Sequence, residues 1–564
     1  MFKKSKEHQQ LSIFSTHTFL SNKSLKEYEN SNNWHNLFRV QVTNRIDEEL
    51  FRPLFCTDNG APNASIRVLV AMMILKEARG CSDSQLFEDS RFNILVRSAL
   101  GLFNIDDHVP VASTYYLLRS RIVERWKAGH SNLMEDVFSS ITKSQIMEFN
   151  INGNKIRMDS KLLGSNIAWF NRYEVVHETL RMAYLSLNGV LDKILPVPVL
   201  SLLQEIVSEP CSNVSYRSSS HQLETKLVKL GVVIYSMLKH LADHSSEPIN
   251  ILREVFHQQY EVVSDDIILL PQERLSSSRI ESPHDPECRY RKKGDQKQKG
   301  YSINITETCN PDNSINLVTN IIVAPANIAD NEFLIPAIEQ TEQIVSDDIE
   351  TINTDGAYHS EVNQDYCHQK GADLILSGLC GFPSRYDLTI DEHNKLIVID
   401  QETKTILPSM QVKTRKPDVP LKWKIKRDNG KFRYFTAKDV ANCLLRKQIA
   451  ERSEAEKNLR NNVEATIFQL AYHYRANKSS YRSLIKHGIW ANARCLWINF
   501  VRIMKYITLL DPNSVNISQN CVQNVNNYFF FINNKIKNSS FLLVRIFLNI
   551  LPLFYIKIEI IDAK

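Results

Sequence analysis

The sequence predicts an α/β protein, because the spacing of its apolar residues changes three times along the chain. Between residues 65 and 125 they recur at helical spacing. From Asn154 the spacing alternates, as in residues 155–160, and alternation is typical of a half-buried strand. Helical spacing returns from about 170 to 270, and strand-like segments follow it. We therefore expect a mixed sheet flanked by helices, with a helical insertion at about 170–275 and an all-α N-terminal domain.

The first 150 residues contain three helices with clear start and stop signals. Ser65 caps the first helix and Gly80 closes it. A capping box starts the second helix at Ser82, and this helix closes near Gly101. The third begins near Ser113 and carries several arginines. Three short capped helices with a basic third member resemble a DNA-binding helical domain. A helical bundle with solvated arginines accounts for the pattern equally well.

The strands expected after the insertion form a second group. Residues 301–308 and 316–323 alternate and can pair across the turn that separates them. Residues 348–354, 372–377 and 395–400 read as further strands. The segment from 151 to 510 is thus expected to form one α/β domain.

Three carboxylates stand at comparable positions in these elements. Asp159 ends the strand that starts at Lys155, and Asp355 follows the strand at 348–354. The two can meet only if their strands are neighbours. Glu464 borders the apolar stripe of a predicted helix at 455–470, with Arg460 one turn before it. Taken singly, Asp355 is more typical of a turn, and Arg460 with Glu464 is more typical of a surface ion pair.

Positive charge gathers in two segments that suit contacts with a nucleic-acid backbone. One is a flexible basic hairpin or loop around Tyr290, and the other follows Glu464 and interleaves with tyrosines. A further basic stretch runs from 413 to 427. Most such runs are only solvated faces. The candidate DNA-contacting residues are Arg289, Arg291, Lys292, Lys293, Arg475, Lys478, Arg482 and Lys486.

Length and composition limit the class of protein. The chain has 564 residues, which is too long for one core, and its 43% hydrophobic and 23% charged residues are ordinary for a globular protein. A net charge of +5 is only mildly basic, so nucleic-acid affinity must come from local clusters. Ten cysteines without a C-x-x-C pair argue against a zinc ribbon or a redox motif. The lysine-containing start lacks an apolar segment, so a cytoplasmic location is expected.

The last part of the chain, residues 511–564, differs in kind from the rest. It is rich in Asn, Lys and Phe, and its apolar segment at 541–561 is interrupted by charged residues and a proline. Its longest uncharged run is too short for a membrane span. We expect no stable membrane association, and we interpret this tail as translated flanking DNA.

The motifs, in this order, resemble bacterial insertion-sequence transposases of the DDE class. They are MDSK at 158–161, SPHDPECRYRKKG at 282–294, GYSINITETC at 300–309, TDGAYHSEVNQDYC at 354–367 and the segment at 460–503. The resemblance covers roughly residues 45–510. It departs from the family pattern at Lys457, where a tyrosine is common, and at Ala471, where a basic residue is common.

The resemblance implies a ribonuclease-H-like core in which Asp159, Asp355 and Glu464 are the catalytic acids and Arg460 supports the last of them. These acids would bind two Mg²⁺ or Mn²⁺ ions. Two such ions, about 4 Å apart, can stabilise the entering and leaving oxygens of a phosphodiester. Hard cations of this type prefer carboxylate oxygens to imidazoles or thiolates. The first product would be a nicked transposon end, whose 3′-hydroxyl then attacks target DNA.

The expected partners are the terminal inverted repeats of the transposon and the target DNA. A homodimer in the DNA complex is expected, because two ends must be joined. A bacterial cytoplasmic protein that associates with the nucleoid when DNA-bound fits this function. Two alternatives stay open: a transposase-derived DNA-binding protein with a decayed core, and a metal-dependent nuclease without strand transfer.

Overall fold

The computed structural model describes residues 1–5, 14–56, 60–187, 189–379, 381, 384–393, 395–412, 422–427 and 429–510. The chain divides into two units, Met1–Ile503 and Met504–Lys564. The second unit is described only over 504–510, which end the last helix. The tail predicted at 511–564 lies outside the described residues, as does most of the basic stretch predicted at 413–427.

The N-terminal part is helical, the first predicted helix starts and ends as expected, and the third starts next to Ser113. Ser65 Oγ accepts from Val68 N, and Gly80 ends the first helix in the left-handed region at φ +59°. The second predicted helix is divided, because Asn93 Oδ1 accepts from Leu95 N and Val96 N and so caps a new helix. The helices are α1 Thr16–Phe19, α2 Asn22–Glu29, α3 Trp34–Gln41, η1 Thr43–Arg45, η2 Glu48–Leu54, α4 Ile66–Arg79, α5 Asp83–Phe92, α6 Ile94–Ala99, α7 Ala112–Lys127 and α8 Leu133–Glu148.

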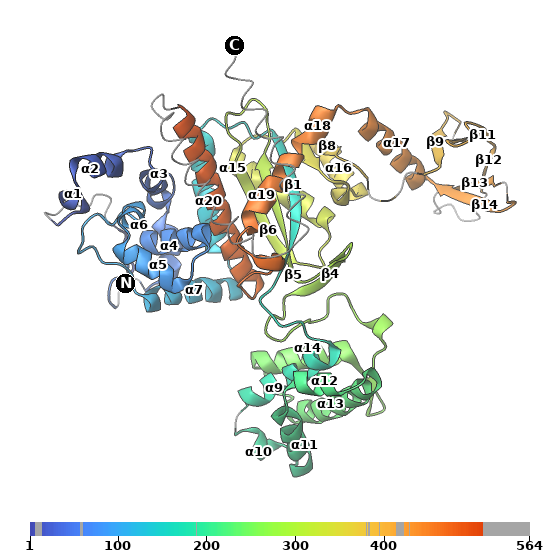
Figure 1. Cartoon of the computed structure of the whole chain (residues 1–564). Helices are drawn as coiled ribbons and strands as arrows, with labels where there is room; N and C mark the ends of the chain where they lie inside the picture. The colour runs from blue at the N-terminus through green and yellow to red at the C-terminus, as the bar shows by residue number, and fades with distance from the viewer. Residues whose placement is uncertain are drawn as a thin grey trace, which may run out of the picture. The chain divides into compact units, whose positions relative to one another are not determined.

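A mixed sheet lies at the centre of the first unit (Figure 1). Its strands are β1 Lys155–Gly164, β4 Arg289–Lys293, β5 Gln296–Thr308, β6 Val318–Pro325, β7 Thr351–Thr354 and β8 Asp373–Leu376. The order is β4-β5-β1-β7-β8, and β6 also pairs with β5. β5 is antiparallel to β1, β4 and β6, whereas β7 is parallel to both β1 and β8. The predicted pairing of the strands at 301–308 and 316–323 is confirmed.

Helices cover both faces of this sheet. Ile156 and Met158 of β1 pack in the core that includes Leu334 of α15 (Leu334–Val345) and Cys367 of α16 (Glu361–Lys370). The alternate residues of β1 point to the other face, where Arg157 donates to the carbonyl of Leu459 beside α19 (Asn461–Ala471). The 3-10 turns η4 Asp330–Phe333 and η5 Gly356–Tyr358 connect these elements.

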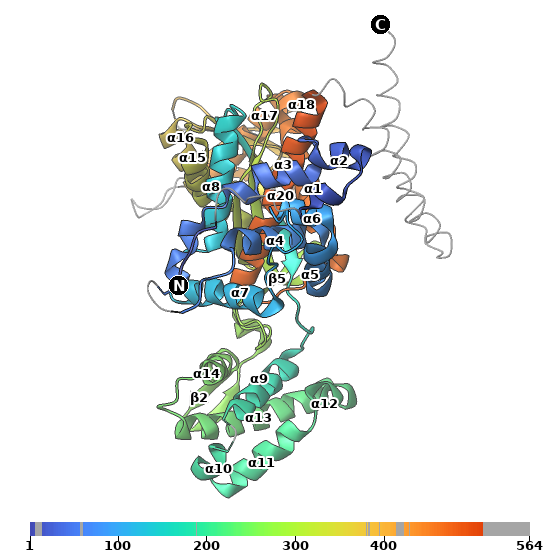
Figure 2. The ribbon, with the colours of Figure 1, turned by 90° about the vertical axis from the view of Figure 1, so that its left-hand side faces the viewer.

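The insertion between β1 and β4 is mainly a group of helices (Figure 2). It has its own core, to which Val176, Leu180 and Ile234 belong. Its helices lie within the segment at about 170–270 where the apolar spacing predicts them, but the prediction is wrong for residues 260–269, which form a hairpin. The helices are α9 Arg172–Ser186, α10 Leu191–Ile194, α11 Val197–Ser208, α12 Cys211–Arg217, α13 Ser220–His240 and α14 Glu247–Gln259. A hairpin, β2 Tyr260–Val263 and β3 Asp266–Leu269, and the turn η3 Gln272–Arg274 follow.

Between β8 and the next helices lies a small β lobe, of which the sequence predicts only one strand, at 395–400. Two three-stranded sheets, β11-β10-β9 and β12-β13-β14, share a core that contains Val398, Trp423 and Phe435. The elements are β9 Tyr386–Ile390, β10 Leu396–Asp400, β11 Ile406–Leu407, β12 Ser409–Gln411, β13 Lys422–Lys426, β14 Phe432–Thr436 and α17 Ala437–Glu451.

The helix predicted at 455–470 is divided into α18 (Glu454–Leu459) and α19. The break follows from the Arg157 contact, because the Leu459 carbonyl accepts from Arg157 at 2.9 Å while Val463 N bonds to the carbonyl of Arg460. The turn η6 Arg475–Asn477 and the helix α20 Leu484–Leu510 complete the described chain. Within the described residues, no helix combines the length and apolar character that a membrane crossing needs.

Candidate active site

Asp159 lies on β1 and not at its end, which corrects the prediction from sequence. β1 continues to Gly164 because β5 pairs with it from Ile156 to Gly164. The parallel pairing with β7, in contrast, ends at Arg157 with Asn353. Asp159 therefore lies two residues beyond the last β1 residue that pairs with β7. Its side chain is 12% exposed.

Asp355 follows β7 directly. β7 is the parallel neighbour of β1, so Asp355 can lie near Asp159. The Asp355 carboxylate caps η5 by accepting from Ala357 N at 2.9 Å. Gly356 is needed in this turn, since a Cβ there would lie 2.2 Å from the carbonyl oxygen of Gly378. The next polar residue, Tyr358, is buried and donates to Asn304 Oδ1 at 2.6 Å, so it serves packing.

Glu464 comes from the first turn of α19, whose buried residues include Val463, Thr466 and Leu470. Its side chain is 61% exposed. Arg460, between α18 and α19, joins it to the two aspartates: its guanidinium nitrogens lie 2.9 Å from Asp159 Oδ2, 3.9 Å from Asp355 Oδ2 and 3.4 Å from Glu464 Oε1. The structure thus brings together the three acids and the arginine that the sequence singles out.

The electrostatics of this group suit a divalent cation. Three carboxylates face one guanidinium, so two negative charges stay unbalanced when all three are ionised. Burial raises the pKa of Asp159 above its ordinary value, Arg460 opposes this increase, and the charge of Asp355 adds to it. All donors are carboxylate oxygens, which are the ligands that Mg²⁺ and Mn²⁺ prefer. Asp159, Asp355 and Glu464 could therefore hold such an ion.

A buried charge network lies beside these acids, and the sequence reasoning missed it. Glu307 of β5 is fully buried and accepts from Arg157 Nε at 2.6 Å, from Arg502 Nη2 at 2.7 Å and from Thr466 Oγ1 at 2.8 Å. Burial disfavours the Glu307 charge, but the two guanidinium groups hold its pKa below the ordinary value. The signal that could have revealed this network is Glu307 itself, a charged residue among the buried positions of β5, the strand that pairs with β1.

The basic segment around Tyr290 is a regular hairpin of β4 and β5, and not a loop. Arg289 donates to the carbonyl of Cys288 at 3.0 Å, and Arg291 pairs with Asp330 at 3.1 Å. Lys292 is exposed, and Lys293 lies 3.8 Å from Asp330 Oδ2. The two arginines are thus engaged within the protein, whereas the two lysines are exposed to solvent.

The basic segment after Glu464 contacts other parts of the first unit. Lys478 Nζ donates to the carbonyl of Ile167 at 2.8 Å, and Arg482 Nε donates to that of Asn166 at 2.6 Å. The Tyr481 hydroxyl bonds to the buried carboxylate of Glu77 on α4. Arg475 and Lys486 are exposed. This segment therefore packs against the N-terminal helices as well as offering charge to solvent.

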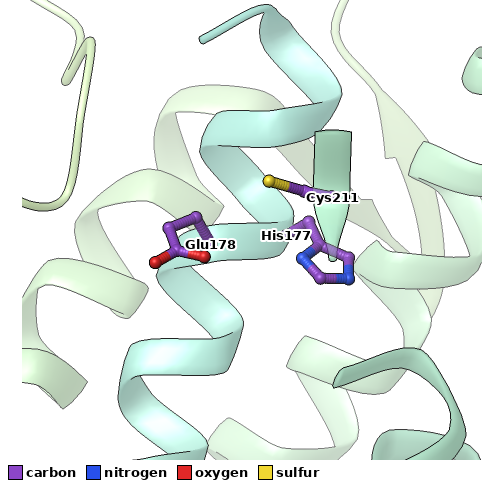
Figure 3. A group of neighbouring side chains, drawn as sticks. All are labelled: His177, Glu178 and Cys211. Atoms are coloured by element: carbon purple, nitrogen blue, oxygen red, sulfur yellow. The ribbon is translucent and has the colours of Figure 1, made fainter. Parts of the chain in front are cut away.

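A second cluster that could hold a metal ion lies in the helical insertion (Figure 3). One donor atom from each of His177, Glu178 and Cys211 lies within 4.8 Å of the others, and all three residues are buried. Glu178 is already bonded to Arg181 at 3.0 Å and to His284 at 3.0 Å. A mixed nitrogen, oxygen and sulfur set suits zinc rather than magnesium, so this cluster differs in chemistry from the carboxylate group.

Comparison with known proteins identifies one part of the chain. Residues 24–121 match the family described as "Transposase domain (DUF772)". No curated protein matches the chain. Among solved structures, a piggyBac transposase synaptic complex with hairpin DNA aligns over 87% of this chain and 84% of its own, at 9% identity and a TM-score of 0.22. A TM-score of this size does not establish a shared fold. Residues 24–121 are therefore similar to a family of transposase domains.

Proposed function

We propose that the chain is a DNA transposase of the DDE class, encoded by a bacterial insertion sequence. The observation that carries this proposal is the convergence of Asp159, Asp355 and Glu464 on the guanidinium of Arg460, in a chain with a transposase domain. Three distant segments supply these acids, and an ordinary surface ion pair would not require that. Metal-dependent phosphodiester chemistry is the function that best uses such a group.

The sheet supports a ribonuclease-H-like core. Three neighbouring strands, β6, β5 and β1, are antiparallel, and β7 and β8 continue in parallel from β1. This order places one acid on the central strand and one just after its parallel neighbour. The third acid then arrives on a helix that covers the same face.

The mechanism assigns a task to each side chain. Asp159, Asp355 and Glu464 would hold Mg²⁺ or Mn²⁺, which stabilise the charge that develops on a phosphodiester under attack. Arg460 orients the three carboxylates toward one another. The exposed Lys292 and Lys293 and the N-terminal helices would bind the backbone of the DNA end.

The partners follow from this reaction. Terminal inverted repeats and target DNA are the substrates, and a homodimer holding two ends is the assembly we propose. The protein would act in the bacterial cytoplasm, at the nucleoid when bound to DNA.

A cleavage assay with labelled terminal repeats and Mg²⁺ tests the proposal. The wild-type chain is expected to give nicked and joined products. Asp159→Asn, Asp355→Asn and Glu464→Gln should each abolish cleavage, by at least about 10²-fold, while the variants still bind the repeats. Glu361→Gln is the matched control, because Glu361 is 71% exposed and pairs with Lys438, not with Arg460.

Each other result selects a different function. Retention of the repeats without cleavage by the wild type would identify a DNA-binding protein with a decayed core. Nicking without joined products would identify a nuclease. Normal cleavage by any one acid variant would remove that residue from the site.

A further inference from the structure

The sheet β12-β13-β14 of the β lobe has one buried face and one exposed face. Trp423, Ile425 and Phe435 point into the lobe core. In an antiparallel sheet, directly paired residues share a face, and neighbours along a strand alternate. The register pairs Lys422 with Thr436, Lys424 with Tyr434 and Met410, and Lys426 with Phe432. The exposed face therefore carries three lysines, two aromatic rings and a methionine, and we call it the outer face.

The rings of the outer face are open to solvent. Phe432 is 44% exposed and Tyr434 is 55% exposed. Lys424 Nζ lies 4.7 Å from the centre of the Phe432 ring, so charge and ring are adjacent. Within the described residues, none of Lys422, Lys424 and Lys426 forms an ion pair with a carboxylate. The outer face is thus positively charged and aromatic.

Solvation accounts for the lysines of the outer face, but it does not account for its exposed aromatic rings. Lysines that prevent pairing between molecules stand on edge strands, whereas these three lysines stand on β13, the central strand of its sheet. Two exposed rings side by side among lysines instead fit a ligand with both phosphates and flat apolar faces. A single strand of nucleic acid has both, because its bases are free to stack on aromatic rings. A duplex offers its phosphates but keeps its base faces covered.

The other side of β14 adds positive charge to the same lobe. A cavity of about 830 Å³ is lined by Arg427, Arg433 and Arg446, among others. Arg385 and Lys447 also line it, but they pair with Asp400 and Asp387. Within the described residues, Arg427 and Arg433 pair with no carboxylate. This charge would attract a polyanion to the lobe.

We propose that the outer face of β12-β13-β14 binds single-stranded DNA, with Phe432 and Tyr434 stacking on bases and the three lysines contacting phosphates. The inference rests on the proposed function, because the lobe belongs to a chain that would nick DNA. A nick frees a strand end whose bases can leave the duplex. The outer face binds such a strand end, and it is a different surface from the one that carries the three acids.

Fluorescence anisotropy with the full-length chain tests this site, using a 20-nucleotide oligo-dT and a 20-base-pair duplex, without divalent metal. Phe432→Ala with Tyr434→Ala should weaken oligo-dT binding by at least about 5-fold, as the loss of base stacking predicts. Duplex binding should change less than about 2-fold. The lysine triple variant, Lys422→Gln with Lys424→Gln and Lys426→Gln, should reduce the salt dependence, log K against log [salt], by about 2 for a single strand.

Matched controls come from the helical insertion. Tyr216→Ala removes a ring that is 93% exposed, and Lys193→Gln with Lys229→Gln and Lys239→Gln removes the same charge from exposed positions. Neither control should change oligo-dT binding. All substituted side chains of the outer face are at least partly exposed, and circular dichroism checks that the variants fold.

Two results would overturn the inference. One is oligo-dT binding by the aromatic variant that equals that of the wild type. The other is an equal loss of duplex and oligo-dT binding, which would indicate only general attraction of phosphates. Because binding is measured without metal, a chain that binds oligo-dT through this face but never cleaves its repeats would reject the transposase proposal alone. If the protein cleaves its repeats but oligo-dT binding does not depend on the outer face, this inference alone is rejected.

Discussion

Asp159 is the least exposed of the three acids, and its charge opposes folding. Burial raises its pKa despite the pair with Arg460, so the folded chain favours the neutral carboxyl more than the unfolded chain does. Stability from this group is therefore present below the unfolded pKa and is lost as pH rises through the folded pKa. At neutral pH the ionised carboxylate destabilises the metal-free fold.

Asp159→Asn is accordingly expected to raise the free energy of unfolding of the metal-free chain, by on the order of 1 kcal/mol. The amide is neutral at every pH and keeps the shape of the side chain. Urea unfolding in EDTA at pH 7.5 measures the difference, with Glu361→Gln as the control. A variant that is less stable than the wild type would contradict the sign of this prediction.

Metal binding should make the wild type more stable than the acid variants. If the acids bind Mg²⁺ with a dissociation constant on the order of 1 mM, then 10 mM Mg²⁺ stabilises the wild type by about 1.4 kcal/mol. Asp355→Asn removes one ligand and should gain less than half of this. Thermal unfolding with and without Mg²⁺ shows the effect. An equal gain in Asp355→Asn and wild type would mean that the ion binds elsewhere.

The sequence identifies the three acids and Arg460 as candidate residues, but it does not reveal the contacts that position them. The acids stand in recognisable motifs, whereas the role of Glu307 depends on contacts with Arg157, Thr466 and Arg502. These four residues are distant in sequence. Their pairing follows only from the register of β1 with β5 and from the packing of two later helices.

The helix α19 illustrates how an element depends on this network. Arg157 binds the Leu459 carbonyl before the helix, and Thr466 on its buried side binds Glu307. Glu464 is exposed and contributes little to the packing of the helix. The network therefore fixes where the helix, and with it Glu464, lies against β1.

Glu307→Gln should destabilise the chain by about 3 to 5 kcal/mol, because it leaves the buried guanidinium of Arg157 and the half-buried guanidinium of Arg502 without a balancing charge. Thr466→Val, which removes one hydrogen bond and keeps the shape, should cost about 1 kcal/mol. Both should also reduce cleavage, although neither residue touches the three acids. Denaturant unfolding and the cleavage assay are the measurements. Unchanged stability in Glu307→Gln would show that the network does not carry the helix.

The elements also show where pattern reading reaches its limit. Alternation locates β1, but it cannot reveal that β5 extends β1 beyond Asp159. Similarly, one apolar stripe predicts a single helix over 455–470, while a side chain from β1 divides it at Arg460. In both cases a partner from a distant segment sets the boundary.

For the whole molecule, the sequence predicts the succession of helical and strand regions but misses most of the β lobe. The lobe strands are short, two to five residues each, and one of them, β13, carries lysines at alternate positions. Their apolar members are few per strand, so only 395–400 is distinctive. The shared core around Trp423 and Phe435 appears only once the two sheets are placed together.

Buried neutral histidines make the stability of the fold depend on pH. In the described part of the chain, burial lowers the pKa of four histidines, His35, His177, His473 and His487. His487 is the clearest case, since it is fully buried, bonds to Ser479 Oγ at 2.7 Å and to the Ser483 carbonyl at 2.8 Å, and packs on Tyr301. Because its folded pKa is depressed, the stability it contributes is present above the unfolded pKa of about 6.5 and is lost as pH falls below it.

We therefore expect the free energy of unfolding to fall between pH 6.5 and 5, with His487 contributing up to about 1.4 kcal/mol per pH unit. Over this range the unfolded chain takes up more protons at this position than the folded chain does, because burial lowers the pKa of His487 in the fold. His487→Gln removes that proton uptake, so its stability should be lower than that of the wild type at pH 7.5 but should decline less steeply below pH 6.5. Denaturant unfolding at pH 7.5, 6.5, 5.8 and 5.2 gives both slopes. Parallel curves for the two proteins would mean that His487 takes up its proton equally in the folded and the unfolded chain, and that another group causes any loss of stability in acid.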